Sequence, residues 1–337
     1  MQVAGLTVRV PEDFGTIGAA LGAVTFGDTI EIGPGDYVEN LYVPDGISLI
    51  GAGRDRTTLH GYVRVDGSDI RISGLRITAT GAAGLPAESF GIRGEAPSAV
   101  ITGNTIDGFV MGIRLTGSEL AEIRGNHVHR NVTGIETFEA GPVVITNNLV
   151  LHNTAAGIRI TDSDTITIAH NTVVGNGFGE ALAAGGAGIA IASFSLETVR
   201  NNVVVSNRGG INVLGTPHLY DHNLVWGNVT NYANAAAPGA GDVSLDPLFV
   251  NAAGGDFHLR PGSPAIDAGV AGLATEDFDG SPRPSGGAPD LGAFEHLAPA
   301  AGVRLVISEV MANPSTRPAA SSSRSTTSAT RRSISRA

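Results

Sequence analysis

The chain has 337 residues, of which 42% are hydrophobic and 47 are glycine, and it contains no cysteine. The apolar content excludes a wholly disordered chain, and the lack of cysteine excludes disulfides and thiolate metal sites. The formal net charge is −11 although residues 317–337 hold five Arg and no acid, so the rest is more acidic still, which argues against a nucleic-acid partner.

The first segment, residues 1–29, is predicted to be an N-terminal cap. Within residues 11–25, Ile17, Ala20, Leu21 and Val24 fall on one helical face. Because the open end of a solenoid must be covered, we expect a short capping helix here, with a loose lead-in segment as the alternative. The chain as given opens without a charged stretch followed by an apolar one, so we expect no export signal in it.

One sequence motif recurs along residues 72–228. It consists of an apolar residue, two further residues, an asparagine and then alternating apolar residues. Successive asparagines are spaced by 22, 22, 23, 31 and 21 residues, and Leu75 occupies the same place in the first copy. Most copies add a second asparagine five residues later and then a Gly-Ile pair. The recurring asparagines are Asn104, Asn126, Asn148, Asn171, Asn202 and Asn223.

This spacing predicts an all-β fold, a parallel β-helix over residues 30–243 with coils of about 22 residues. Strands this short cannot bury a face alone, so successive coils should stack and pair in parallel about 4.8 Å apart. Isoleucines then form columns inside, and the asparagines form a ladder of amide hydrogen bonds in one turn. A leucine-rich repeat, the alternative at this period, lacks its leucine signature here.

The two long spacings mark insertions at roughly 78–90 and 177–187. Both fall between the second asparagine and the Gly-Ile strand, so we expect both loops on the same side of the helix. Long loops on one face of a repeat protein often form a binding face. Tolerated surface insertions are the other interpretation, since long loops cost little.

With these repeats, residues 30–230 resemble the pectate-lyase-like superfamily. The resemblance implies a right-handed β-helix whose substrate, commonly a polysaccharide, lies along the sheet made by the Gly-Ile strands.

Residues 244–297 resemble a choice-of-anchor Q module, on the segments 246–251, 256–269 and 290–295. That resemblance implies export and a closing coil. Its acids Asp277, Asp279, Asp290 and Glu295 are interpreted as turn formers that pair with Arg283, or else as a calcium site.

Residues 298–337 form a linker, a start that resembles a lamin-tail domain at 305–314, and a tail rich in Arg, Ser and Thr that we expect to be disordered. The abrupt end of the resemblance suggests a truncation or a shifted reading frame.

The residue after each Gly-Ile pair should point outward by strand alternation. Down the stack this column contains Arg93, Arg114, Glu136, Arg159, Ala190 and Asn212. We predict Arg114, Glu136 and Arg159 as candidate catalytic residues. Candidate substrate-binding residues are Arg93, Phe138 and Asn212, and Asp162 and Asp164 are candidate calcium ligands.

Lyase chemistry on a uronic-acid polymer requires a neutralised carboxylate and a base. Arginine serves the first need, but the chain has no Lys, and an ionised Arg is a poor base. A hydrolase would need paired carboxylates, for which Asp162 and Asp164 are candidates. Histidines 127, 129, 152, 170 and 222 occupy different columns and are not expected to converge. A charge ladder without function is the alternative for Arg114, Glu136 and Arg159.

We therefore predict a secreted or surface-exposed bacterial β-helix protein that binds polysaccharide without catalysis. The alternative is an enzyme, a polysaccharide lyase in preference to a glycoside hydrolase. Calcium is the one cofactor considered. We expect a monomer, no nucleic-acid partner and no membrane span.

Overall fold

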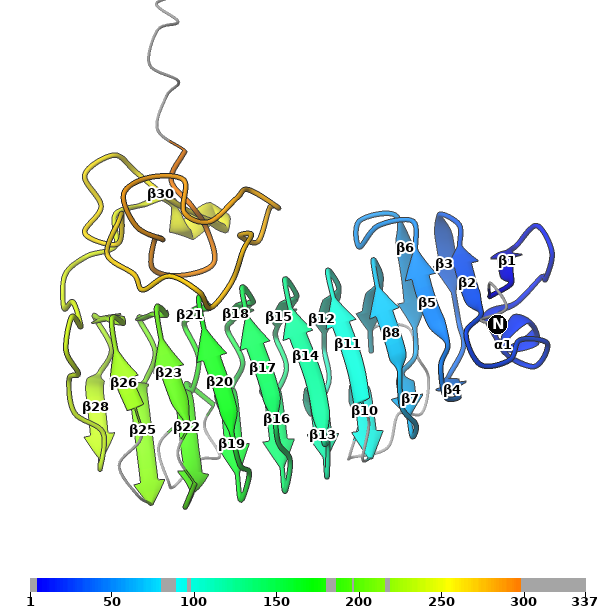
Figure 1. Ribbon diagram of the computed structural model, residues 1–337, viewed down its shortest axis with the longest axis horizontal. Helices are drawn as coiled ribbons and strands as arrows, with labels where there is room; N and C mark the ends of the chain where they lie inside the picture. The colour runs from blue at the N-terminus through cyan, green and yellow to red at the C-terminus, as the bar shows by residue number, and fades with distance from the viewer. Residues whose placement is uncertain are drawn as a thin grey trace, which may run out of the picture. The chain divides into compact units, whose positions relative to one another are not determined.

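The computed structural model describes residues 5–79, 89–95, 98–179, 186–195, 197–215 and 219–297. In these residues the chain winds into a parallel solenoid whose coils each contribute one strand to three long sheets (Figure 1). The predicted all-β parallel helix with coils of about 22 residues is confirmed.

Sheet A has ten strands, all paired in parallel. They are β1 (Thr7–Val10), β2 (Thr29–Ile32), β5 (Ser48–Gly51), β8 (Ile70–Ser73), β11 (Ser98–Thr102), β14 (Leu120–Arg124), β17 (Val143–Thr146), β20 (Ile166–Ala169), β23 (Thr198–Arg200) and β26 (Leu219–Asp221).

Sheet B has nine strands of mostly three residues. They are β3 (Gly35–Tyr37), β6 (Thr57–His60), β9 (Arg76–Thr78), β12 (Thr105–Asp107), β15 (His127–His129), β18 (Leu149–Leu151), β21 (Thr172–Val174), β24 (Val203–Val205) and β27 (Leu224–Trp226).

Sheet C also has nine strands and contains the Gly-Ile pairs. They are β4 (Leu41–Val43), β7 (Val63–Val65), β10 (Phe90–Glu95), β13 (Met111–Thr116), β16 (Thr133–Phe138), β19 (Ala156–Thr161), β22 (Ala187–Ser193), β25 (Gly209–Gly215) and β28 (Thr230–Asn234).

The core consists of like residues stacked from coil to coil. In sheet A, Ile101 pairs with Ile123, which pairs with Ile145, and each is fully buried. Burial of an aliphatic side chain contributes about 1.5–3 kcal/mol. The repeat therefore stabilises the fold through many equal steps.

Two asparagine ladders close the turns on either side of sheet B. The six predicted asparagines form one buried column, in which each side-chain nitrogen lies 3.0–3.1 Å from the next side-chain oxygen. The second asparagines form another column with the same contacts, such as Asn131 Nδ2 to Asn153 Oδ1 at 3.1 Å. Each amide also donates to a main-chain carbonyl, as Asn126 does to Ile101 O at 2.8 Å. Buried backbone groups of the turns are thereby paired.

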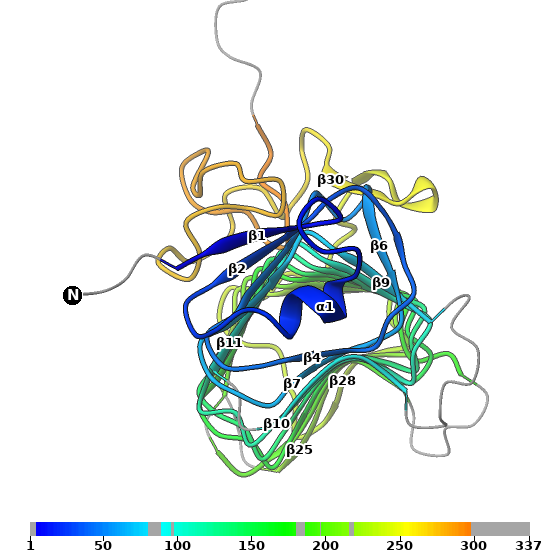
Figure 2. The ribbon, with the colours of Figure 1, turned by 90° about the vertical axis from the view of Figure 1, so that its right-hand side faces the viewer.

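The N-terminal segment contains a strand as well as a helix. Helix α1 (Ile17–Leu21) is capped by Thr16, whose hydroxyl accepts from Ala19 N at 3.1 Å, and it buries Ile17 and Ala20. Figure 2 shows α1 at the N-terminal end of the coil stack. Strand β1 pairs with β2, so sheet A begins within residues 1–29 and the boundary at residue 30 is too late. That α1 serves as a cap stays a prediction.

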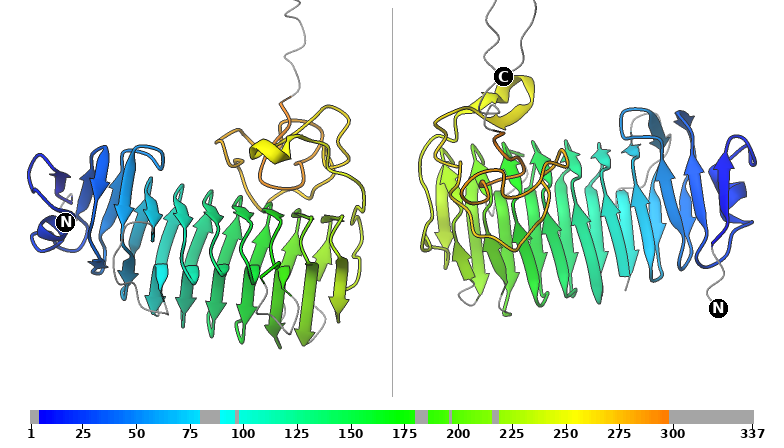
Figure 3. Two further views of the ribbon diagram at one scale, coloured as in Figure 1. Left: turned by 180° about the vertical axis from the view of Figure 1, so that it is seen from behind. Right: turned by 45° about the horizontal axis from the view of Figure 1, so that its top comes forward.

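Residues 244–297, called here the C-terminal module, lie along the side of the helix and not across its end (Figures 1 and 3). They contain the antiparallel strands β29 (Phe249–Asn251) and β30 (Asp256–Leu259), joined by the 3₁₀ turn η1 (Ala252–Gly254). Module side chains such as Phe257, Leu259 and Phe294 share a buried cluster with outward residues of β18, β21, β24 and β27.

The expectation that this module forms a closing coil is therefore wrong. After β28 the coil continues over residues 235–243 through the isolated bridges Asp221 to Ala240 and Leu224 to Val243, and the module begins beyond them. The lateral position buries the apolar outward residues of sheet B, which stabilises the contact.

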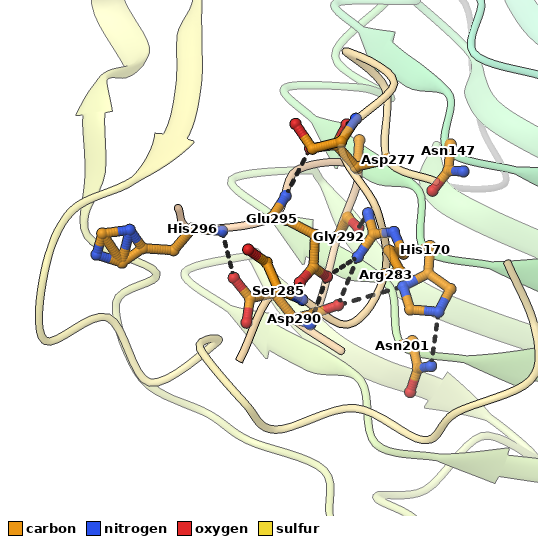
Figure 4. A network of polar contacts seen from close by, with 12 residues as sticks. Asn147, His170, Asn201, Asp277, Arg283, Ser285, Asp290, Gly292, Glu295 and His296 are labelled. Carbon is orange, nitrogen blue, oxygen red and sulfur yellow. Dashed lines mark hydrogen bonds and ion pairs between the residues drawn. The ribbon is translucent and has the colours of Figure 1, made fainter. Parts of the chain in front are cut away.

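A buried ion pair holds the module together. Arg283 Nη1 lies 2.6 Å from Glu295 Oε1, and both side chains are fully buried (Figure 4). The guanidinium also donates to Asp290 O at 3.1 Å and Gly292 O at 2.7 Å. Burial lowers the pKa of Arg283 in spite of the nearby acids. The predicted pairing of a module acid with Arg283 is thus present for Glu295.

Among the described residues, no helix has the length and apolar character needed to cross a membrane. Residues 298–337, with the lamin-tail-like start and the expected disordered tail, lie outside the described residues.

Candidate functional site

The outward face of sheet C carries the predicted column in register. Arg93 pairs with Arg114, Arg114 with Glu136, and Glu136 with Arg159. Ala190 and Asn212 continue the column toward the C-terminus. The structure adds Arg64, which precedes Arg93 on β7. This arrangement follows from strand alternation, because the flanking isoleucines point into the core.

The three candidate catalytic residues are brought together as a charge ladder. Glu136 Oε2 lies 3.5 Å from Arg114 Nη1, and Glu136 Oε1 lies 3.7 Å from Arg159 Nη1. Glu136 is 7% exposed, and its Oε2 atom is buried. Both carboxylate oxygens of Glu136 therefore face a guanidinium group. The three side chains form a charge ladder, and the catalytic role predicted for them stays a prediction.

The first part of the column is also paired. Arg93 contacts Glu95, and Arg64 Nε lies 2.5 Å from Asp66 Oδ2, with Glu95 Oε2 at 4.0 Å from Arg64 Nη2. The hydrogen bond that Arg64 donates to Asp66 raises the pKa of Arg64. These groups are exposed enough that their pairing contributes little to stability.

Aromatic rings lie beside the arginines. The Arg114 guanidinium carbon is 5.8 Å from the ring centre of Phe138, and that of Arg93 is 4.8 Å from Phe90. Phe138 is half-buried. The predicted binding residues Arg93 and Phe138 therefore belong to one continuous band of cations and rings.

A shallow depression follows this band on β19, β22 and β25. It has a volume of about 210 Å³ and is lined by Arg159, Ala190 and Asn212, with Leu214 at its edge. Asn212 Oδ1 accepts a hydrogen bond of 2.5 Å from Asn234 Nδ2. Small side chains at Ala190 and Ala192 keep this part of the face low.

The candidate calcium ligands Asp162 and Asp164 lie in the turn after β19. Both are exposed, and buried Ser163 stands between them, with its hydroxyl 3.2 Å from Thr137 Oγ1. Within the described ranges, no group of three or more His, Asp or Glu side chains is placed to hold a metal ion. Calcium binding at these two carboxylates stays a prediction.

Sequence reasoning missed a cluster of titratable groups on sheet B. The rings of His127 and His129 lie 4.3 Å apart, and His129 Nε2 is 3.7 Å from Asp107 Oδ2. The expectation that the histidines do not converge is thus wrong for this pair. The His-Val-His pattern was the available signal, because alternate residues of a strand share a face.

Asp107 is the centre of that cluster, and its side chain is only 3% exposed. Its oxygens lie 2.7 Å from Thr78 Oγ1, 2.8 Å from Arg76 Nη2 and 3.3 Å from Arg130 Nη2. Burial acts to raise the pKa of Asp107, but the Thr78 hydrogen bond and the cations hold it below its ordinary value. Burial lowers the pKa of His127 to about 3 and that of His129 to about 4, so both rings are neutral at pH 7.

The two insertions predicted as binding loops fall mostly outside the described residues, at 80–88 and 180–185. Their part in a binding face stays a prediction.

Among solved structures, the chain is similar to the pectate lyase Pel9A, with 15% identity, a TM-score of 0.53 and coverage of 88% of this chain and 97% of that one. It is also similar to the alginate lyase from Paenibacillus sp. str. FPU-7, with 16% identity, a TM-score of 0.46 and coverage of 71% and 98%. At these identities the likeness concerns the fold alone.

No curated protein matches the sequence. The family model described as the right handed beta helix region matches residues 61–229, half of the chain. With three parallel sheets, stacked coils and this match, the chain belongs to the right-handed β-helix family.

Proposed function

We propose that this protein binds an acidic polysaccharide along the outward face of sheet C and does not cleave it. The observation that carries the proposal is the in-register column in which Arg64, Arg93 and Arg114 occupy successive strands and Arg159 follows after Glu136. Strands in one sheet are about 4.8 Å apart, so the first three cations lie at short intervals along an extended polymer, and the fourth lies one strand beyond Glu136. Guanidinium groups bind carboxylates in a bidentate manner, which suits uronic-acid units.

The pairing of Glu136 favours binding over catalysis. Elimination from a uronate needs a group that removes a proton, and Glu136 is already held by Arg114 and Arg159. The similarity to a pectate lyase keeps polysaccharide lyase activity as the second candidate, and its name supports uronate polymers as the ligand class.

The test is affinity electrophoresis of the full chain in gels that contain polygalacturonate or alginate, beside an absorbance assay for unsaturated products with calcium or a chelator. We expect retardation without absorbance. The double variant Arg114→Ala and Arg159→Ala should lose retardation, whereas Arg56→Ala, an exposed arginine in the loop between β5 and β6, should keep it. Retention of binding by the double variant would refute the assignment, and calcium-dependent absorbance would establish a lyase.

We further propose that residues 244–297 are a choice-of-anchor Q-type module and that the protein acts outside the cell or at its surface. The motif order in this segment and the polymer class proposed for sheet C support the location. Protease accessibility on intact cells, with an intracellular protein as control, tests it. Protection from protease until lysis would contradict it.

Calcium at Asp162 and Asp164 is proposed as an accessory site of the same face. Titration of the full chain with calcium chloride should give binding that is lost in Asp162→Asn. An unchanged titration in that variant would remove the site.

A further inference from the structure

A second cleft lies between the module loop, residues 272–280 of the C-terminal module, and the outward face of sheet A. The first asparagine ladder separates it from the cluster around Asp107 on sheet B. The volume of the cleft is about 710 Å³, within the range of small-molecule sites. The strands β11, β14 and β17 contribute Thr102, Arg124 and Thr146, and Arg54 lies at one end. This cleft shares none of the residues of the sheet C band.

The wall formed by the module loop is fixed by hydrogen bonds. Asn147 Nδ2 donates to Glu276 O at 2.6 Å, which ties the loop to the turn after β17. Asp277 Oδ1 accepts from Asp279 N at 2.9 Å and Ser281 N at 2.7 Å, while its Oδ2 accepts from Glu295 N at 2.9 Å (Figure 4). A wall with these contacts is preorganised and needs little ordering when a ligand binds.

The floor of the cleft is open because two coils carry glycine where later coils carry larger residues. Gly103 and Gly125 precede ladder asparagines with φ of +66° and +62°, and Asn147 holds the same place with φ of +53°. A Cβ atom at Gly103 would meet nothing within 4 Å, and one at Gly125 would meet no atom closer than 3.9 Å. The backbone therefore accepts asparagine here, and the glycines leave room for a ligand.

Arg54 is a half-buried cation in this cleft, and burial lowers its pKa although Asp55 and Asp279 act to raise it. Its guanidinium carbon lies 4.3 Å from the ring centre of Phe278, and Nη1 donates to Gly125 O at 3.2 Å. In the part of the chain that the structure describes, no carboxylate is within 4.0 Å of it. Arg124, by contrast, is paired with Glu122 at 2.8 Å. A desolvated guanidinium with donors to spare is best completed by a carboxylate from a ligand.

We propose that this cleft binds a carboxylate-bearing saccharide, with the carboxylate on Arg54 and the sugar hydroxyls facing Thr102, Arg124 and Thr146. The lining contains hydroxyl, guanidinium, carboxylate and amide groups together with Gly103 and Gly125. Such a set of donors and acceptors suits a ligand with many hydroxyls better than a simple anion. The cleft is independent of the sheet C band, so either can bind without the other.

The first experiment measures binding of trigalacturonate to the full chain by isothermal titration. Loss of a charge-assisted bidentate contact in Arg54→Gln should raise the Kd about tenfold or more. The control is Arg56→Gln, which removes the same charge from an exposed residue two positions away and should leave the Kd unchanged. Trigalacturonate with its carboxylates methyl-esterified should bind as weakly as the Arg54→Gln variant binds the free acid.

A second pair of variants tests the floor without removing charge. Gly125→Asn should fill the cleft and raise the Kd about tenfold or more. Gly227→Asn is the matched control, because Gly227 precedes the ladder residue Asn228 with φ of +65° and an added Cβ would meet only Ser206 Oγ at 3.9 Å. Both variants should keep the Tm of the parent.

Three results would overturn the proposal. The first is no binding of trigalacturonate to the parent chain, and the second is an unchanged Kd in Arg54→Gln or Gly125→Asn. The third is displacement of trigalacturonate by acetate at the same carboxylate concentration, which would indicate a simple anion site. Loss of binding in Arg114→Ala with Arg159→Ala, but not in Arg54→Gln, would place the saccharide on sheet C alone.

Discussion

The outward face of sheet B changes character along the stack. In β9, β12 and β15 it carries polar residues such as Arg76, Asp107 and His127, which lie outside the apolar cluster that sheet B shares with the module and are called the uncovered half here. In β18 and β24 it carries apolar ones such as Leu149 and Val203, which the module buries. The backbone and the asparagine ladders continue unchanged through both halves. The outward side chains alone therefore decide where the solenoid is covered.

The largest expected effect concerns the ion pair inside the covering module. Glu295→Gln removes the charge that compensates buried Arg283, and loss of one partner of such a pair costs about 3–5 kcal/mol. Chemical denaturation should show this loss, with earlier proteolysis of the module. Glu276→Gln, an exposed acid of the same module, is the control and should change the unfolding free energy very little. Equal stability of the two variants would show that the pair does not hold the module.

One added carboxylate should shift the boundary between the covered and the uncovered half of sheet B. Val203→Asp places a carboxylate in the buried contact beneath the module and should cost about 3 kcal/mol. Thr58→Asp adds the same charge to the uncovered half, where Arg76 is the neighbouring residue on β9, and should be tolerated. Thermal unfolding and limited proteolysis measure the difference. Release of the module by both variants, or by neither, would contradict the idea that outward side chains set the boundary.

Histidines in both halves make the fold sensitive to acid. Burial lowers the pKa of His127 in the uncovered half and of His170 under the module to about 3, from an ordinary value of 6.5. Between these values the unfolded chain binds more protons than the folded chain, so stability falls as the pH falls through this window. Each histidine should add up to about 1.4 kcal/mol per pH unit to that slope.

Replacement of either histidine by glutamine removes the ring whose protonation in the unfolded chain causes this loss of stability. We expect His127→Gln and His170→Gln each to flatten the plot of unfolding free energy against pH between about 6.5 and 3. His152→Gln serves as a control for the substitution itself. A parallel displacement of the whole curve, without a change of slope, would show that protonation is not the cause.

The repetition in the sequence made the coils and ladders predictable. Asn104, Asn126 and Asn148 recur at one spacing, and the physics of stacking then allows a single register. The column on sheet C followed in the same way from strand alternation. The pairing of Glu136 with Arg114 and Arg159 was one of the alternatives that this column left open, because the side-chain angles that decide it are not encoded in spacing.

The lateral position of the module was not predicted, although a signal existed. Leu149-Val150-Leu151 and Val203-Val204-Val205 are apolar at every position, which indicates strands buried on both faces. His127-Val128-His129, in contrast, alternates. Reading each strand for its outward residues would have located the covered half. Arg54 could not be found in this way, because its place in the cleft depends on a contact with Phe278 far along the chain.

The smallest expected effect concerns His258 at the surface of the module. Its contribution to stability changes with pH in the opposite direction to that of His127 and His170. Its ring nitrogens lie 2.6 Å from Asp256 and 2.7 Å from Asp279, which joins β30 to the loop that walls the cleft. Burial opposes the charged ring, but the two carboxylates raise the pKa of His258 above its ordinary value. Its contribution to stability is therefore complete below pH 6.5 and is lost as the pH rises through the raised value.

Because the His258 side chain is 46% exposed, solvent screening should limit this contribution to less than about 1 kcal/mol. His258→Asn should lower the Tm slightly at pH 6 and not at pH 9, while His127→Gln should show its effect only in acid. Equal loss at both pH values would mean that His258 acts by packing on Phe294, whose ring centre is 4.2 Å away, and not by its charge. The covered and uncovered halves of the molecule would then differ in packing but not in the sign of their response to pH.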